Sequence, residues 1–198
     1  MEGEKKEGES YIPYIPLEIE NEETKNWEGE EGESYIPLEI ANSEYKLWRY
    51  LYDLYCGIKC CGLTNEVYKK KLVKNYPEFY ISECGSGGTC HAGEEMRIYF
   101  VEKGTGLVKI VWEGDTYVSG SNESIAGLKK SNVEFKDLDN DGNLEIIQNV
   151  VEMKCKSQKG CCWAEECCEN GEIISKREYQ KIFRWDEGNR KFVEISSD

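Results

Sequence analysis

Acidic and amide side chains alternate along one short stretch of this 198-residue chain, at Asp137, Asp139, Asp141, Asn143 and Glu145. Calcium takes six to eight oxygen ligands at about 2.3–2.6 Å. Alternate side chains converge on one ion only where the backbone turns sharply, and Gly142 permits such a turn. The spacing therefore predicts a calcium site made from the four carboxylates and the backbone carbonyl of Asn143.

The segments on either side of this loop predict strands rather than the helices of an EF-hand. Residues 131–135 alternate polar and apolar side chains, and residues 144–151 are rich in β-branched side chains. An EF-hand also places a glutamate at the twelfth loop position, where this chain has Gln148. The alternative to a calcium site is a solvated turn of Asp, Asn and Gly without metal.

The loop and its flanks resemble one known family. The sequence FKDLDNDGNLEII is similar to the calcium loop of the FG-GAP and VCBS (integrin-like) repeats, and YQKIFRWDEGNRKFVEI resembles their closing hairpin. The resemblance covers roughly residues 131–195 and implies a calcium-bound hairpin between strands. A propeller needs several blades, whereas this chain has a single such loop, so neither a closed propeller nor integrin-like ligand binding is expected.

The chain has 10 cysteines, at Cys56, Cys60, Cys61, Cys84, Cys90, Cys155, Cys161, Cys162, Cys167 and Cys168. An even number together with a calcium loop favours disulfides and an extracytoplasmic location, either secreted, periplasmic or at the cell surface. No signal peptide is visible, because the first residues are acidic and lack an apolar segment. A cytosolic protein is the alternative.

The dense cluster from Cys155 to Cys168 has a second interpretation, a zinc site, because Cys162 and Cys167 have a spacing that zinc ligands use. Adjacent cysteines are expected to bond to different partners, since a ring closed by two neighbouring cysteines is strained. The pairing itself does not follow from the sequence.

Residues 1–42 form an acidic segment with an internal repeat. The docking segment predicted here has two copies, Tyr14, Ile15, Pro16 and Leu17, and then Tyr35, Ile36, Pro37 and Leu38. Each copy is either part of an extended, disordered tail or a strand-like peptide that adds to a sheet edge. That edge belongs to the same domain or to a neighbouring subunit.

Residues 43–198 are expected to form one cysteine-rich α+β calcium-binding domain. Helices are predicted at 43–56 and 64–75, packed on a mainly antiparallel β-sheet or sandwich. The predicted strands cover residues 96–102, 107–113, 115–119, 179–185 and 191–195, with a hairpin at 103–106 and a turn near 186–189.

The charge and the shortage of histidine narrow the function. A net charge of -14 argues against nucleic acid, and no stretch is apolar enough for membrane insertion. His91 is the one histidine, so histidine-based catalysis is not expected. The leading hypothesis is a non-enzymatic calcium-binding recognition or adhesion module with a protein partner. The alternatives are a structural subunit of a surface filament or lattice, joined by the Tyr-Ile-Pro repeats, and a hydrolase that uses acidic residues.

Overall fold

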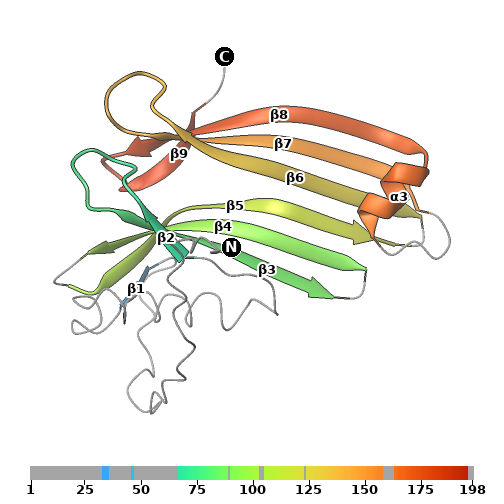
Figure 1. Cartoon of the computed structure of the whole chain (residues 1–198), viewed down its shortest axis with the longest axis horizontal. Coiled ribbons are helices and arrows are strands. Elements are labelled where there is room, and N and C mark those ends of the chain that lie inside the picture. The colour runs from blue at the N-terminus through green and yellow to red at the C-terminus, as the bar shows by residue number, and fades with distance from the viewer. Residues whose placement is uncertain are drawn as a thin grey trace, which may run out of the picture.

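The computed structural model describes residues 33–35, 46, 67–88, 90–102, 105–122, 124–157 and 163–195. These residues form a 9-stranded antiparallel sheet and a short helix, α3 (Ala164–Asn170). The strands are β1 (Glu33–Tyr35), β2 (Val67–Lys70), β3 (Phe79–Gly88), β4 (His91–Glu102), β5 (Leu107–Ser121), β6 (Ile125–Lys136), β7 (Glu145–Lys156), β8 (Ile173–Asp186) and β9 (Lys191–Ile195). Strands β2 to β9 are neighbours in chain order, and β1 pairs with β5 (Figure 1).

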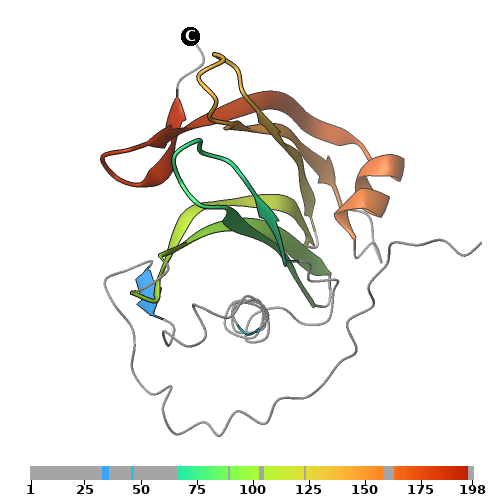
Figure 2. The same cartoon turned by 60° about the vertical axis from the view of Figure 1, so that its left-hand side comes forward.

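The sheet divides into two layers where β5 and β6 separate. These strands pair only where Tyr117–Ser121 meets Ala126–Lys130, so the β3–β5 layer and the β6–β8 layer diverge beyond that point (Figures 1 and 2). At the separation the carbonyl oxygen of Asp115 accepts hydrogen bonds from Ser131 Oγ at 2.5 Å and Gln148 Nε2 at 2.9 Å. These side chains replace the lost strand pairing.

The main hydrophobic core contains residues from both layers and from the β2–β3 loop. Its buried members are Leu72, Val73, Phe79, Ile81, Met96, Ile98, Phe100, Val111, Trp112, Ile146 and Phe192. Aromatic rings join the layers, because Trp185 of β8 lies 5.5 Å from Phe79 of β3 and 4.9 Å from Tyr76 in the β2–β3 loop, centroid to centroid. The core thus holds β8 and β9 against the first strands.

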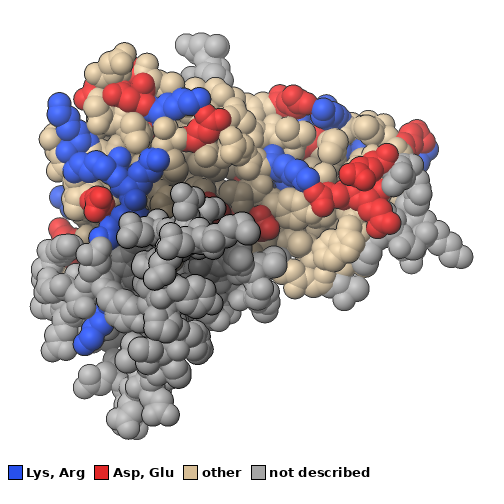
Figure 3. Space-filling model, viewed as in Figure 1, with Lys and Arg blue, Asp and Glu red and all other residues tan. Residues whose placement is uncertain are grey.

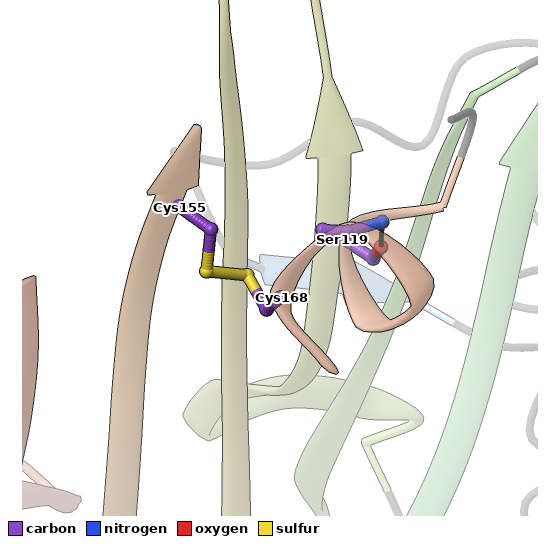
Figure 4. Close-up of a disulfide and its surroundings, with 4 residues drawn as sticks. Ser119, Cys155 and Cys168 are labelled. Atoms are coloured by element: carbon purple, nitrogen blue, oxygen red, sulfur yellow. Dashed lines mark hydrogen bonds between the residues drawn. A yellow bond between two sulfur atoms is a disulfide. The ribbon is translucent and has the colours of Figure 1, made fainter. Parts of the chain in front are cut away.

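A smaller cluster lies under α3, where Ala126, Leu128, Ala164 and Cys167 are buried together. The N–H of Ala164 donates a hydrogen bond to Ser119 Oγ at 3.2 Å. A disulfide joins Cys155 of β7 to Cys168 of α3 (Figure 4). The helix is therefore fixed to the sheet by a covalent bond, a hydrogen bond and apolar packing.

The predicted α+β class is wrong for the described residues, whose structure is almost entirely antiparallel sheet. The helix predicted over 64–75 is replaced by strand β2, in which Tyr68 pairs with Ile81, and by a loop that carries Leu72 and Val73 into the core. Valine and tyrosine favour strands, and pairing with β3 outweighs the local helical pattern. The predicted helix over 43–56 lies outside the described residues, apart from Lys46, which is helical.

Most strand predictions are confirmed, including β9 with its exact bounds and the strands flanking the acidic loop. The predicted break between residues 113 and 115 is wrong, because β5 runs continuously from Leu107–Ser121. A Cβ placed on Gly114 would lie 2.7 Å from the Trp112 ring. This glycine therefore makes room for a core indole instead of ending the strand.

Candidate metal-binding loop

The acidic loop connects β6 to β7 and is closed by antiparallel pairing of Lys136 with Glu145. Two of its residues adopt left-handed backbone conformations, Asn140 with φ 61° and Gly142 with φ 90°. Asparagine and glycine are the residues that adopt this conformation most readily. The backbone therefore turns sharply at both residues. The turn at Gly142 is the one that the sequence predicts.

The structure brings together three of the predicted ligands. Carboxylate oxygens of Asp137, Asp139 and Glu145 all lie within 4.8 Å of one another. Asp139 is exposed, whereas Glu145 is fully buried at 1% exposure. Three converging carboxylates with outward access form a group that could hold a hard metal ion.

Each oxygen of the buried Glu145 carboxylate has a defined partner. Oε2 accepts a hydrogen bond from the Leu138 N–H at 2.8 Å, and Oε1 accepts one from Arg184 Nε at 3.2 Å. Arg184 also places Nη2 3.0 Å from Asp139 Oδ2. A guanidinium on β8 thus partly neutralises two of the three carboxylates, and the buried charge is paired.

The side chain of Asp141 points toward Asn143 instead of joining this acidic triad. Its two oxygens accept hydrogen bonds from the Asn143 N–H at 2.7 Å and from Nδ2 at 2.8 Å. The backbone hydrogen bond, followed by the side-chain one, lowers the pKa of Asp141 below its usual value. The sequence predicts Asp141 as a ligand, but its carboxylate is not part of the triad. The predicted backbone carbonyl of Asn143 stays a prediction.

The acidic loop is attached to the β2–β3 loop, which the sequence did not indicate. Asn143 Oδ1 accepts a hydrogen bond from the Lys74 N–H at 2.9 Å, and the Leu144 N–H donates to the Leu72 carbonyl at 2.7 Å. A Cβ on Gly142 would lie 3.2 Å from Lys74 Cδ, so the two loops are in close contact. Leu72 is part of the core, and the loop's position is therefore linked to core packing.

Basic side chains gather on one face of this end of the molecule, although the net charge of the chain is -14. Figure 3 shows positive side chains gathered at the end that carries the β2–β3 and β6–β7 loops. Lys69, Lys70, Lys71 and Lys74 belong to β2 and the loop after it.

The cysteines that the structure describes are oxidised. Cys155 and Cys168 are bonded to each other, and Cys90 and Cys167 each take part in a disulfide. None of these four sulfurs is available as a zinc thiolate, which favours the disulfide prediction for the part of the cluster described. The side chain of Cys84 and the predicted cysteines Cys56, Cys60, Cys61, Cys161 and Cys162 lie outside the described part.

The predicted docking segment is described only at Tyr35, the last residue of β1. The other residues of this segment lie outside the described residues, namely Tyr14, Ile15, Pro16, Leu17, Ile36, Pro37 and Leu38.

No helix in the described ranges is long and apolar enough to cross a membrane.

A hollow of about 680 Å³ lies on β5 to β8, toward the disulfide and away from the acidic loop. Ion pairs line it, with Lys129 Nζ 2.8 Å from Asp115 Oδ2 and Arg177 Nη2 2.6 Å from Glu152 Oε2. Val118, 40% exposed, adds an apolar surface. The sequence does not indicate this hollow, because its lining residues come from four different strands.

Arg184 is the residue of the candidate site that the sequence did not indicate. It sits within the predicted strand 179–185, but its closeness to the acidic loop depends on the register of β7 against β8, which pairs Ile146 with Phe183. No local pattern in the sequence fixes that register.

Comparisons with protein-family models, curated proteins and solved structures found no match to this chain. The functional argument therefore depends on the residues of the loop and on their geometry.

Proposed function

We propose that this protein is a non-enzymatic, extracytoplasmic calcium-binding module, in which calcium and disulfides stabilise a β-rich recognition or adhesion domain. The observation that carries the proposal is the convergence of Asp137, Asp139 and buried Glu145 at one hairpin. All three groups offer oxygen, which hard cations such as calcium prefer over nitrogen or sulfur.

The full proposed ligand set adds Asp141 and the backbone carbonyl of Asn143. To coordinate the ion, the Asp141 carboxylate gives up the hydrogen bonds that it accepts from Asn143. Both groups lie in the same tight turn as the triad, and the change involves a side-chain rotation of an exposed residue. Calcium sites commonly combine carboxylates with a backbone carbonyl in this way.

Arg184 supplies the counter-charge when no ion is bound. Its guanidinium contacts Asp139 and Glu145, and a bound dication takes over that neutralising role. Because Arg184 is 46% exposed at its side chain, it can turn toward solvent. The loop therefore remains folded in both states, and calcium adds stability through binding to the folded state.

The disulfide and the family resemblance support the same proposal. A disulfide is compatible with an extracytoplasmic location. The strand–loop–strand arrangement agrees with the hairpin that the FG-GAP and VCBS resemblance implies. The hollow on β5 to β8 is the proposed recognition surface.

Isothermal titration of calcium into chelator-treated full-length protein tests the proposal. We expect one site in the wild type and a weaker one in Asp139→Asn. The matched control is Asp186→Asn, because Asp186 also accepts turn hydrogen bonds, from Gly188 and Asn189 in the β8–β9 turn. Absence of calcium binding, or equal weakening by both variants, contradicts the proposal.

A second candidate function, a structural subunit of a surface filament or lattice, is favoured by one observation. Strand β1 ends at Tyr35, the first residue of a Tyr-Ile-Pro repeat, and it adds to the edge of β5. Strand addition by such a segment to a neighbouring subunit is a known mode of assembly. Deleting residues 1–31 is expected to abolish assembly while the fold persists, and an unchanged oligomeric state contradicts this function.

A further inference from the structure

The segment that forms β1 occurs twice in the chain. Residues 31–37 read Glu-Gly-Glu-Ser-Tyr-Ile-Pro, and residues 7–13 have the identical sequence. Glu33, Ser34 and Tyr35 form β1, so Glu9-Ser10-Tyr11 has the same side chains in the same order. A single chain thus contains two copies of the segment that pairs with β5.

The register of β1 against β5 defines the edge that receives this tripeptide. The antiparallel register sets Glu33 opposite Lys109, Ser34 opposite Val108 and Tyr35 opposite Leu107. Opposite charges in facing positions stabilise an antiparallel pair, and Val108 is completely buried. Strand β6 joins β5 only at Tyr117–Ser121, so among the described strands β1 alone pairs with this edge of Leu107–Lys109.

We propose that the β5 edge at Leu107–Lys109 is an acceptor site for the Glu9-Ser10-Tyr11 segment of a second copy of this chain. The inference rests on the second candidate function and names its acceptor and its donor. Each chain has two segments of this sequence, whereas the edge at Leu107–Lys109 pairs with one strand at a time. Placing Glu9 where Glu33 now lies keeps the acidic residue opposite Lys109.

Exchange between chains retains the facing residues of the β1–β5 pair, since the two segments have the same sequence. The difference lies in tethering, because a segment on the same chain has an effective concentration on the order of millimolar. A segment from a second copy competes when the protein itself approaches that concentration. Because the donor and acceptor surfaces differ, such contacts join chains head to tail, and the rotation between neighbours decides whether they form a ring or a filament.

Photo-crosslinking of the full-length, oxidised protein tests this assignment. A benzophenone amino acid replaces Tyr11 in one sample and Tyr35 in another, and each is mixed at high concentration with ¹⁵N-labelled wild-type chains. Mass spectrometry of the digested product then identifies the captured peptide and the chain from which it comes. The register predicts that both positions capture the peptide containing Leu107.

For the probe at position 11, we expect capture of that peptide from the other chain. Ser10→Pro should abolish capture by removing a backbone N–H and restricting the strand, and Ser34→Pro should increase it by releasing the acceptor. Capture within one chain only, capture elsewhere, or indifference to Ser10→Pro overturns the inference. Light scattering on the same samples separates the two ideas: multimers without this capture leave the assembly function in place, whereas a monomer at every concentration refutes both.

Discussion

Replacing Glu145 with glutamine tests whether the buried carboxylate is both a structural anchor and a calcium ligand. In the wild type its two oxygens accept hydrogen bonds from the Leu138 N–H and from Arg184 Nε. Glutamine has a single oxygen, so one donor must then face an amide NH₂ in a site that is 1% exposed. A hydrogen bond to a charged group contributes about 1.5–3 kcal/mol. Arg184 is 46% exposed, and solvent therefore screens part of its interaction with Glu145. We expect the free energy of unfolding in chelator to fall by about 2 kcal/mol.

The second effect of Glu145→Gln appears only when calcium is present. At a calcium concentration of about 100 times Kd, binding stabilises the wild-type fold by roughly 2.7 kcal/mol. Loss of a charged ligand is expected to weaken binding at least about tenfold, which reduces this increment to about 1.4 kcal/mol at the same concentration. The two effects are separable because the first is measured in chelator.

Urea unfolding followed by tryptophan fluorescence, without reductant and in either calcium or chelator, measures both effects. Glu134→Gln is the matched control, because Glu134 lies on the same hairpin and pairs with Lys136 outside the triad. The control should lose less than about 1 kcal/mol and keep the full calcium increment. An equal calcium increment in Glu145→Gln and the wild type would refute the role of Glu145 as a ligand.

Three further predictions concern the scaffold. Replacing both cysteines of the β7–α3 disulfide, which are 13 residues apart, with serine should cost about 3 kcal/mol in urea unfolding, and no loss would mean that the bond adds no constraint. Gly114→Ala should cost about 1–3 kcal/mol through contact with the neighbouring indole, whereas Gly127→Ala, which meets nothing within 4 Å, should not; equal costs contradict this reading of the packing. Tyr179 and then Arg177 donate to Glu152 and lower its pKa, so the stabilisation is present above the ordinary value of 4.5 and is lost as pH falls through the lowered pKa. Tyr179→Phe should therefore raise the pKa of Glu152 in an NMR titration, and an unchanged pKa would show that the 2.6 Å hydrogen bond is not its cause.

Strand predictions from the sequence succeeded where local pattern and tertiary structure agree. Strand β9 (Lys191–Ile195) and the strands flanking the acidic loop were predictable because β-branched and aromatic residues stand between clear turn signals. The segment 64–75 was not, since its apolar spacing fits a helix and only the pairing of Val67–Lys70 with β3 decides otherwise. Gly114 has the appearance of a strand break, and its role depends on a side chain that packs over it.

The candidate site was predictable in part for the same reason. The carboxylates of Asp137, Asp139 and Glu145 converge because they share one tight loop, which the spacing reveals. Arg184 enters the site through a strand register, and the contact with Lys74 depends on the path of the β2–β3 loop. Neither contact has a local signature in the sequence.

A native mass spectrum of the full-length protein, prepared without reductant, tests the central claim most directly. We predict one calcium ion per chain in calcium-containing buffer, lost on addition of chelator, with the Cys155–Cys168 disulfide intact in both samples. A spectrum with no bound calcium, or with zinc on reduced thiols, would contradict the account.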